Sequence, residues 1–353
     1  MLFQVYNREI VKHMKIDFVI TWVDGSDPKW RAQKEAVYKS INPQQINGDD
    51  SNSECRYRDM GALRYWFRGV EKFAPWVNRI FFVTCSQKPE WLNVSHPKLV
   101  FVEDKDYMPS KYMPTFNAIP IELNFHRIPS LSEYFVFFND DMFLLRPITP
   151  ELYFREGVPY LPCDMKMNRS YVYDNWSKML FNNYCVVNQN FNMREAIWKH
   201  RKKWFSFKNL GFMSTMMNLV CFRINKRTDS KDYEHLPTPH LKSTLQEVWD
   251  KCPDIMDHAS SFRFRSGEQV NHCLFCGWNQ AEGKFYPARE YSRGAAKSVE
   301  SKNIDEICDI IKNQSYPQVC LNDSAATDNA EECFERIRRA FDVILPEKSS
   351  FEK

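Results

Sequence analysis

Short apolar runs separated by longer amphipathic stretches characterise the first part of the chain. The runs, each predicted to be a buried strand, lie at residues 16–22, 79–84, 98–102 and 134–138. Apolar residues recur with helical spacing over residues 58–74, and residues 114–127 also read as a helix, although Pro120 lies within it. Strands that alternate with helices predict an α/β fold, in which helices flank both faces of a mostly parallel sheet.

The pattern changes after about residue 150. Prolines at positions 147, 150, 159 and 162 mark an exit from the sheet. Apolar spacing predicts a helix over residues 241–252, and Ser266 with Gln269 forms an S-x-x-Q capping box that predicts another over residues 266–281. We therefore predict an α/β core over residues 1–150 and a mainly helical part over residues 151–353, joined in one integrated unit.

Composition narrows the class of protein. The 353 residues include 48 basic and 45 acidic side chains, a balance that argues against nucleic acid as a partner. No apolar run approaches the roughly 20 residues that span a bilayer, and no secretory signal is evident, so we expect a cytoplasmic protein without a transmembrane segment. The 11 cysteines are scattered, which is typical of reduced, buried thiols. Cys273 and Cys276 form a lone CxxC, a weak zinc signal that a helix interior explains equally well.

Acidic residues follow two of the predicted strands. Asp24 and Asp27 come after the first strand, and Asn139, Asp140 and Asp141 come directly after the fourth. The carboxyl ends of parallel strands share one edge of the sheet, where ligands bind, so these carboxylates can converge. Converging carboxylates need a cation, and Mg²⁺ or Mn²⁺ suits oxygen ligands and phosphates. Structural alternatives remain for the first pair: Asp27 before Pro28 fits a helix N-cap, and Asp24 before Gly25 fits a turn.

Further candidates lie outside the strand ends. Glu122 and His126 are four residues apart on the predicted helix, where a surface ion pair is the simpler explanation. His235 and His240 flank two prolines in EHLPTPHL, which predicts a stiff loop whose histidines could act as acids or bases.

Two arginines precede the predicted helix at residue 266. Arg263 and Arg265 alternate in SSFRFRS, so one of them is expected to point inward, where a guanidinium suits a phosphate and a salt bridge is the alternative. Neither a P-loop nor a dinucleotide-binding glycine motif is present, which disfavours those classes of nucleotide site.

Long motifs in order along the chain resemble the Stealth family of sugar-1-phosphate transferases, which includes bacterial enzymes of capsular polysaccharide synthesis and the catalytic subunits of GlcNAc-1-phosphotransferase. The motifs begin with IDFVITWVDGSDPKW and continue through residues 56–144, residues 234–274, and VCLND with the terminal ILPEKSSFE. The resemblance implies a GT-A-like, Rossmann-type fold. It also implies transfer of a hexose 1-phosphate from a UDP-sugar, with UDP-GlcNAc as the default donor, to a glycan acceptor with release of UMP.

The resemblance also implies site residues, which are Asp27, Glu122, Asp140, Asp141, His240 and Arg265. Asp140 and Asp141 would hold the metal, Arg265 would neutralise phosphate charge, and His240 would act as an acid or base or bond a phosphate. Asp27 would lie near the diphosphate or acceptor, and Glu122 near donor hydroxyls or the acceptor proton. The remaining candidates for substrate binding are Trp22, Asp24, Arg58, His126, Asn139 and Arg263.

Two other functions fit the same sequence. An ordinary GT-A glycosyltransferase would release UDP instead of UMP, and a non-catalytic polysaccharide-binding protein would use the aromatic residues, which make up 15% of the chain. The basic segment 194–208 suits an anionic polymer or peripheral contact with the inner face of a membrane, although a solvated helix face explains it as well.

Overall fold

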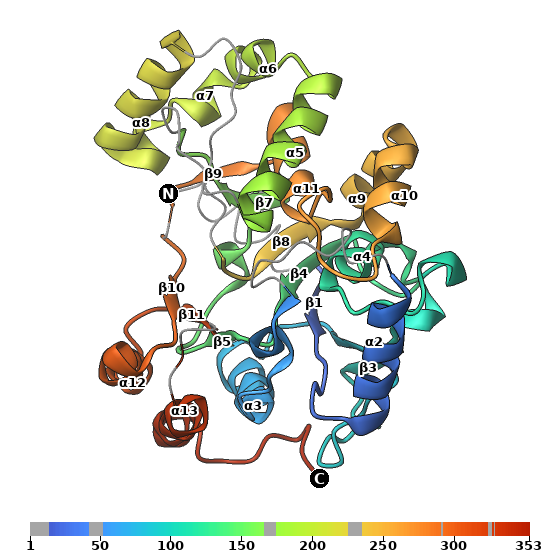
Figure 1. The fold of residues 1–353 in the computed structure, drawn as a ribbon. Coiled ribbons are helices and arrows are strands. Elements are labelled where there is room, and N and C mark those ends of the chain that lie inside the picture. The colour runs from blue at the N-terminus through green and yellow to red at the C-terminus, as the bar shows by residue number, and fades with distance from the viewer. Residues whose placement is uncertain are drawn as a thin grey trace.

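The computed structural model describes residues 14–41, 52–165, 174–224, 235–290, 292–323, 327 and 329–353. Its centre is a five-stranded sheet in the order β3-β2-β1-β4-β8 (Figure 1). The strands are β1 Ile16–Thr21, β2 Ile80–Thr84, β3 Leu99–Glu103, β4 Tyr134–Phe138 and β8 Thr238–Leu241. The first four run parallel, and β8 pairs antiparallel with β4 at the edge. The predicted α/β fold with a mostly parallel sheet is therefore confirmed.

Helices cover both faces of this sheet. The α-helices are α2 Pro28–Ser40, α3 Leu63–Phe73, α4 Ala118–Leu123, α5 Asn175–Asn190, α6 Met193–Lys199, α7 Arg201–Trp204, α8 Phe207–Ile224, α9 Lys242–Lys251, α10 Pro253–Ser261, α11 Cys273–Glu282, α12 Ile304–Lys312 and α13 Ala330–Ile344. Short 3₁₀ helices lie at η3 Glu54–Tyr57, η4 Asp104–Asp106, η5 Ser110–Tyr112, η6 Phe125–Arg127, η7 Pro150–Leu152 and η8 Ser301–Asn303. No described helix is both long and apolar enough to cross a membrane.

Two smaller sheets pair segments that are far apart in the sequence. One has the order β10-β11-β5 and the other β6-β7-β9. Their strands are β5 Met142–Leu144, β6 Phe154–Arg155, β7 Val158–Pro162, β9 Tyr286–Ala288, β10 Ala295–Ser298 and β11 Gln318–Asn322. Because β11 pairs with β5 and β8 pairs with β4, late segments of the chain lie directly against β4 and β5 of the first half.

The apolar runs form strands because both faces of each strand are buried. Along β1, Phe18 and Ile20 pack into one core with α3, α12 and α13, whereas Val19 packs into a second core with α4, α9, α10 and α11. Phe135 and Phe137 of β4 belong to the second core in the same way. Strands covered on both faces are expected to lack polar alternation, which is what these sequences show.

Three predicted elements differ from the structure. Instead of one helix over residues 114–127, α4 covers only Ala118–Leu123, and the 3₁₀ helix η6 follows it. Pro120 is in the first turn of α4, where its missing N–H costs no hydrogen bond. Glu122 and His126 therefore do not share one continuous α-helical face, contrary to the prediction.

The helix predicted from residue 266 begins later, at Cys273. The backbone N–H of Ser266 does donate to the side chain of Gln269, at 3.0 Å, but this pair closes a turn rather than opening a helix. Cys273 and Cys276 are both buried inside α11, so the helix-interior explanation of the CxxC is confirmed. The segment around His240, predicted to be a loop, contains strand β8.

Candidate functional site

A cavity of about 660 Å³ lies at the carboxyl ends of β1, β2 and β4. Segments far apart in the sequence line it; they include Trp22, Arg56–Met60, Thr115–Ile119, Glu122, Asn139–Met142, His235, Arg265, His272 and Asp323. Asp140, Asp141 and Arg265 line the cavity, but the predicted convergence of Asp24 and Asp27 with the Asp140–Asp141 pair is wrong. Asp24, Asp27, His126, His240 and Arg263 do not line the cavity.

Negative charge is concentrated at the end of β4. The pKa of Asp140 is raised to about 8, chiefly by burial and also by the neighbouring carboxylates of Asp141 and Asp59. Burial also raises the pKa of Asp59. One carboxylate oxygen of Asp141, Oδ1, is buried without a hydrogen-bond partner among the described residues. Arg265 lowers the pKa of Asp140, but by less than burial and the two neighbouring carboxylates raise it, so a bound cation would stabilise the charged form of these acids.

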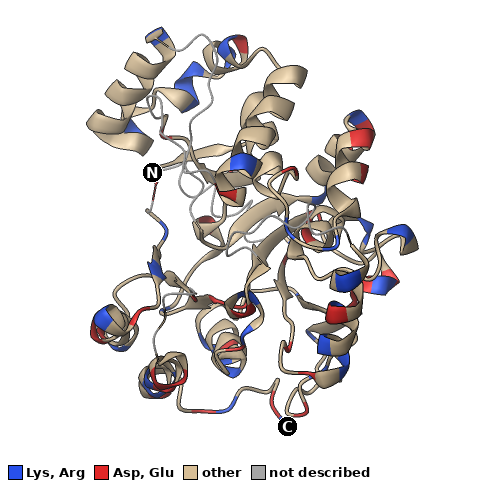
Figure 2. Cartoon of the chain, in the orientation of Figure 1, with Lys and Arg blue, Asp and Glu red and all other residues tan. Residues whose placement is uncertain are grey.

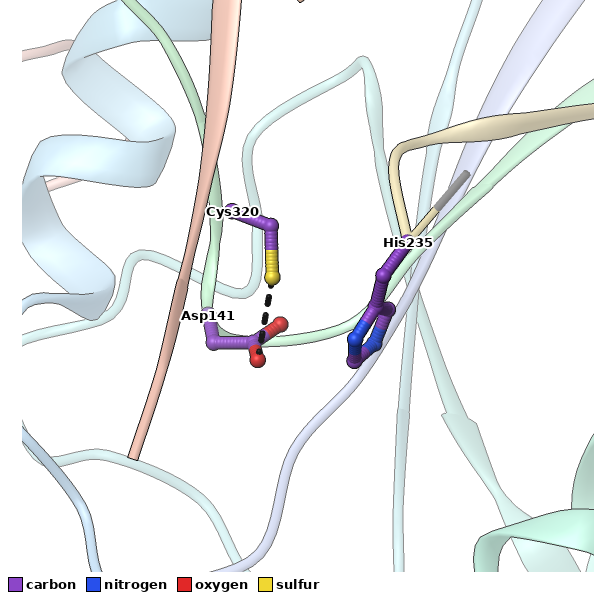
Figure 3. A group of neighbouring side chains, drawn as sticks. All are labelled: Asp141, His235 and Cys320. Atoms are coloured by element: carbon purple, nitrogen blue, oxygen red, sulfur yellow. Dashed lines mark hydrogen bonds between the residues drawn. The ribbon is translucent and has the colours of Figure 1, made fainter. Parts of the chain in front are cut away.

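Asp141, His235 and Cys320 approach one another within this region (Figure 3). One potential ligand atom from each lies within 4.8 Å of the others. The Cys320 thiol donates to Asp141 Oδ2 at 3.3 Å, and burial raises the pKa of this thiol well above its usual value, so it remains protonated. Burial lowers the pKa of His235, whose neutral ring lies 3.1 Å from the Asn139 amide nitrogen. The carboxylate oxygens are thus available to Mg²⁺ or Mn²⁺, and the His235 imidazole would add a nitrogen ligand suited to Mn²⁺ once its Nε2 no longer accepts from Asn139.

A carboxylate and an imidazole form a second pair on the cavity wall. His272 Nδ1 lies 2.7 Å from Glu122 Oε2, and both side chains are mostly buried. When Nδ1 donates to Glu122, the other ring nitrogen, Nε2, is left with a lone pair that can accept a proton. The position of Glu122 in the site agrees with its candidacy, but His272 was missed. A single histidine between unremarkable neighbours, with no spacing partner, gives no local signal in the sequence.

Arginines supply positive charge to the same cavity. Arg265 lines the cavity, and its backbone N–H donates to Asn52 Oδ1 at 2.9 Å. Arg263 turns away and donates to the carbonyl of Lys111 at 3.0 Å, so the predicted alternation of the two arginines is confirmed. Arg58 also lines the cavity, where it holds Asp323 through two hydrogen bonds of 2.8 and 2.9 Å. Asp323 belongs to the VCLND motif but was not singled out from the sequence.

Asp24 and Asp27 shape the loop after β1. Asp27 caps α2 by accepting from the backbone N–H groups of Lys29 and Trp30, at 2.8 and 3.3 Å, and the Lys29 bond contributes most to lowering the pKa of Asp27. Asp24 accepts from the backbone and the hydroxyl of Ser26, which closes a turn. The structural explanations considered for both residues therefore hold. Between them, a Cβ on Gly25 would lie 1.9 Å from the carbonyl oxygen of Tyr57, so this turn packs directly against the cavity segment 56–60.

His240 and His126 are core residues. His240 pairs with Phe135 across β8 and β4, is fully buried, and has no hydrogen-bond partner for either ring nitrogen among the described residues. Burial lowers its pKa well below the usual value. Its ring lies 5.8 Å from that of His272, so it stands one layer behind the cavity wall. Burial lowers the pKa of His126 to about 4, and its ring packs on Trp249.

Comparison with known proteins gives a consistent picture. The family models described as Stealth protein conserved regions 1 and 2 match residues 14–40 and 56–160. The receptor polysaccharide phosphotransferase WefC of Streptococcus gordonii is 38% identical over 96% of this chain and 99% of its own length. A capsular polysaccharide phosphotransferase WcwK of Streptococcus pneumoniae is 37% identical over 96% and 99%. The exopolysaccharide phosphotransferase cps2G of Lactiplantibacillus plantarum is 34% identical over 96% of both chains.

Proposed function

The chain belongs to the Stealth family, and on that premise we propose that it is a polysaccharide phosphotransferase of capsular or exopolysaccharide synthesis. The proposed reaction transfers a hexose 1-phosphate from a UDP-sugar, by default UDP-GlcNAc, to a hydroxyl group of a glycan acceptor, and UMP leaves. The observation that carries the proposal is the composition of the cavity: acids for a cation, arginines for phosphate and a Glu–His pair for a proton all line it.

The reaction forms one bond and breaks one. The acceptor oxygen attacks the β-phosphorus, while the bond between this phosphorus and the bridging oxygen breaks, so that UMP departs with the bridging oxygen. The glycosidic bond is not cut, and the anomeric configuration is retained. Such phosphoryl transfer depends mainly on positioning and on stabilisation of charge along an in-line path.

The proton of the acceptor hydroxyl is assigned to His272. Its Nε2 takes the proton, and the Glu122 carboxylate at 2.7 Å stabilises the imidazolium that results. Glu122 thus serves the acceptor proton, one of the two roles predicted for it. The ring of His240 lies 5.8 Å from that of His272, and His240 does not line the cavity. We therefore assign His240 a positioning role, in which it packs against His272.

The phosphate groups are assigned to Arg265 and Arg58. A guanidinium can contact two phosphate oxygens at once, and the Asp323 carboxylate fixes the orientation of Arg58. Asp140 and Asp141 would hold Mg²⁺ or Mn²⁺, with His235 as a further ligand for Mn²⁺, and the bound cation would neutralise charge on the diphosphate. Asn139 orients His235, and Trp22 offers an aromatic face for the nucleotide or sugar.

The other candidates act at a distance from the substrate in this proposal. Asp24 and Asp27 hold the loop that carries Trp22, Arg263 ties the 263–265 segment to Lys111, and His126 packs under α9.

The test is the identity of the released nucleotide. The protein is incubated with a panel of UDP-sugars, Mg²⁺ or Mn²⁺, and short glycan acceptors, and the products are analysed by mass spectrometry. Release of UMP with a phosphodiester-linked product is expected. Release of UDP would assign the cavity to a glycosyltransferase, and glycan binding without any metal-dependent binding of a UDP-sugar, measured by titration calorimetry, would assign the protein to the non-catalytic class.

A further inference from the structure

Helix α8 differs from an ordinary surface helix because it buries polar side chains and exposes large apolar ones. Beyond Gly211, whose φ of 75° interrupts the helix, two polar residues, Thr215 and Asn218, are fully buried against the protein. Asn218 donates to the carbonyls of Cys163 and Trp204, at 3.0 and 2.8 Å, and accepts from the backbone N–H of Met165 at 2.6 Å. The polar stripe is therefore the side by which α8 is attached to the rest of the molecule.

The exposed surface of α8 is largely apolar. Large apolar side chains on it with exposed surface are Phe207, Phe212, Met213, Met216, Met217, Leu219, Val220 and Ile224. Met213 is 77% exposed and Phe212 67%. A surface helix normally buries its apolar stripe, and a contiguous exposed apolar patch marks a site of interaction with another molecule or a membrane. In Figure 1, α8 lies at the outer edge of the molecule beside α6 and α7.

Cationic residues surround this apolar face. Residues 194–224 contain seven Lys and Arg residues and one acidic residue, Glu195, so the segment carries a net charge of +6, although the whole chain carries only +3. Lys and Arg, blue in Figure 2, recur along α6, α7 and α8. Trp198 on α6 is 58% exposed and adds an amphipathic ring of the kind enriched at membrane interfaces.

We propose that the outer face of α8, with the basic residues of α6 and α7, docks the protein on the surface of an anionic phospholipid bilayer. In this arrangement α8 lies parallel to the membrane at the boundary between headgroups and acyl chains, and the basic side chains contact lipid phosphates. The charge favours a lipid surface as the partner. Basic side chains close to an apolar, methionine-rich surface complement a bilayer that has negatively charged headgroups and an apolar interior. The proposal does not depend on the reaction assigned to the cavity.

The test uses the full chain and sedimentation with vesicles of phosphatidylcholine, with or without phosphatidylglycerol, at low and high salt. Wild-type protein is expected to sediment with the anionic vesicles and to be partly released by salt. The double substitution Phe212→Ser/Met213→Ser should weaken partitioning at least about tenfold, and Lys199→Gln and Lys202→Gln should each weaken it about fivefold. Val343→Ser on α13 is the matched control, since this residue is also exposed and apolar, at 63%, and should leave binding unchanged.

Because the substituted side chains are exposed, thermal unfolding of the variants should match that of the wild type. Failure of the wild type to bind anionic vesicles, or equal binding by the Phe212→Ser/Met213→Ser variant, overturns the proposal. Light scattering tests whether a second copy of the chain covers this face instead. A wild type that is dimeric and does not bind vesicles, with a Phe212→Ser/Met213→Ser variant that is monomeric, would assign the face to that second copy.

Discussion

The Glu122–His272 pair gives the sharpest prediction, because its two members should behave as one unit. Replacement of His272 by Gln removes the group that accepts the proton and should reduce kcat by about 10²–10⁴-fold, the usual contribution of a general base. Glu122→Gln keeps the shape of the side chain but removes the charge that faces His272 at 2.7 Å. A hydrogen bond to a charged group contributes about 1.5–3 kcal/mol, which corresponds to a loss of roughly 10–150-fold in kcat.

The assay is steady-state release of nucleotide, combined with calorimetric titration of the donor. Donor affinity should be unchanged in both variants, because neither residue is assigned to the diphosphate. The double variant Glu122→Gln/His272→Gln should be no slower than His272→Gln alone, since Glu122 acts only through His272. His258→Gln is the matched control; this residue is exposed on α10, 3.9 Å from Glu268. A rate for His272→Gln within threefold of the wild-type rate, or losses that multiply in the double variant, would refute the assignment.

Three other predictions address the cation, the phosphate and acid stability. Asp140→Asn should reduce turnover by at least about 100-fold and abolish the Mg²⁺ dependence of donor binding in calorimetry; retained dependence would exclude Asp140 as a ligand. Arg265→Lys should raise the donor dissociation constant about 10–150-fold, whereas Arg263→Lys, which points away, should stay within about twofold. Burial lowers the pKa of His126 to about 4 in the folded protein. As the pH falls below the ordinary histidine pKa of about 6.5, this side chain is protonated in the unfolded state but not in the folded state, so the free energy of unfolding decreases. Between roughly pH 7 and pH 4, the free energy of unfolding measured with urea should therefore fall by about 2–3 kcal/mol less in His126→Gln than in the wild type. An equal fall in the two proteins would contradict this.

The strand ends were predictable because local sequence determines them. An apolar run that stops at Asn139-Asp140-Asp141 predicts both a buried parallel strand and its acidic edge, and β4 ends there as expected. The N-cap at Asp27 and the alternation of Arg263 with Arg265 were likewise local features. These patterns place side chains on a strand end or a face without reference to the rest of the fold.

The position of the histidines was not predictable in the same way. The prolines of EHLPTPHL suggested a loop, but Thr238–Leu241 forms the edge strand of the sheet, where one side of the backbone needs no partner and Pro239 is tolerated. This pairing buries His240 and leaves His235, just before the strand, at the cavity.

Residues brought in by long-range pairing were also hidden. Cys320 and Asp141 are 179 residues apart in the sequence, and they meet only because β11 pairs antiparallel with β5. Nothing in the sequence of either segment specifies that partner. The apolar face of α8 was missed for a related reason. Its spacing is helical, but the sequence does not show which stripe faces the protein, and here three backbone contacts of Asn218 decide it.

In the proposed reaction, the bond that breaks lies between the β-phosphorus and the bridging oxygen of the donor. This is tested most directly with UDP-GlcNAc that carries radioactive phosphorus in the β position, incubated with the protein, Mg²⁺ and a glycan acceptor. The label should move into the glycan product, while the released nucleotide should be unlabelled UMP. Recovery of the label in free UDP, with an unlabelled glycan product, would contradict it.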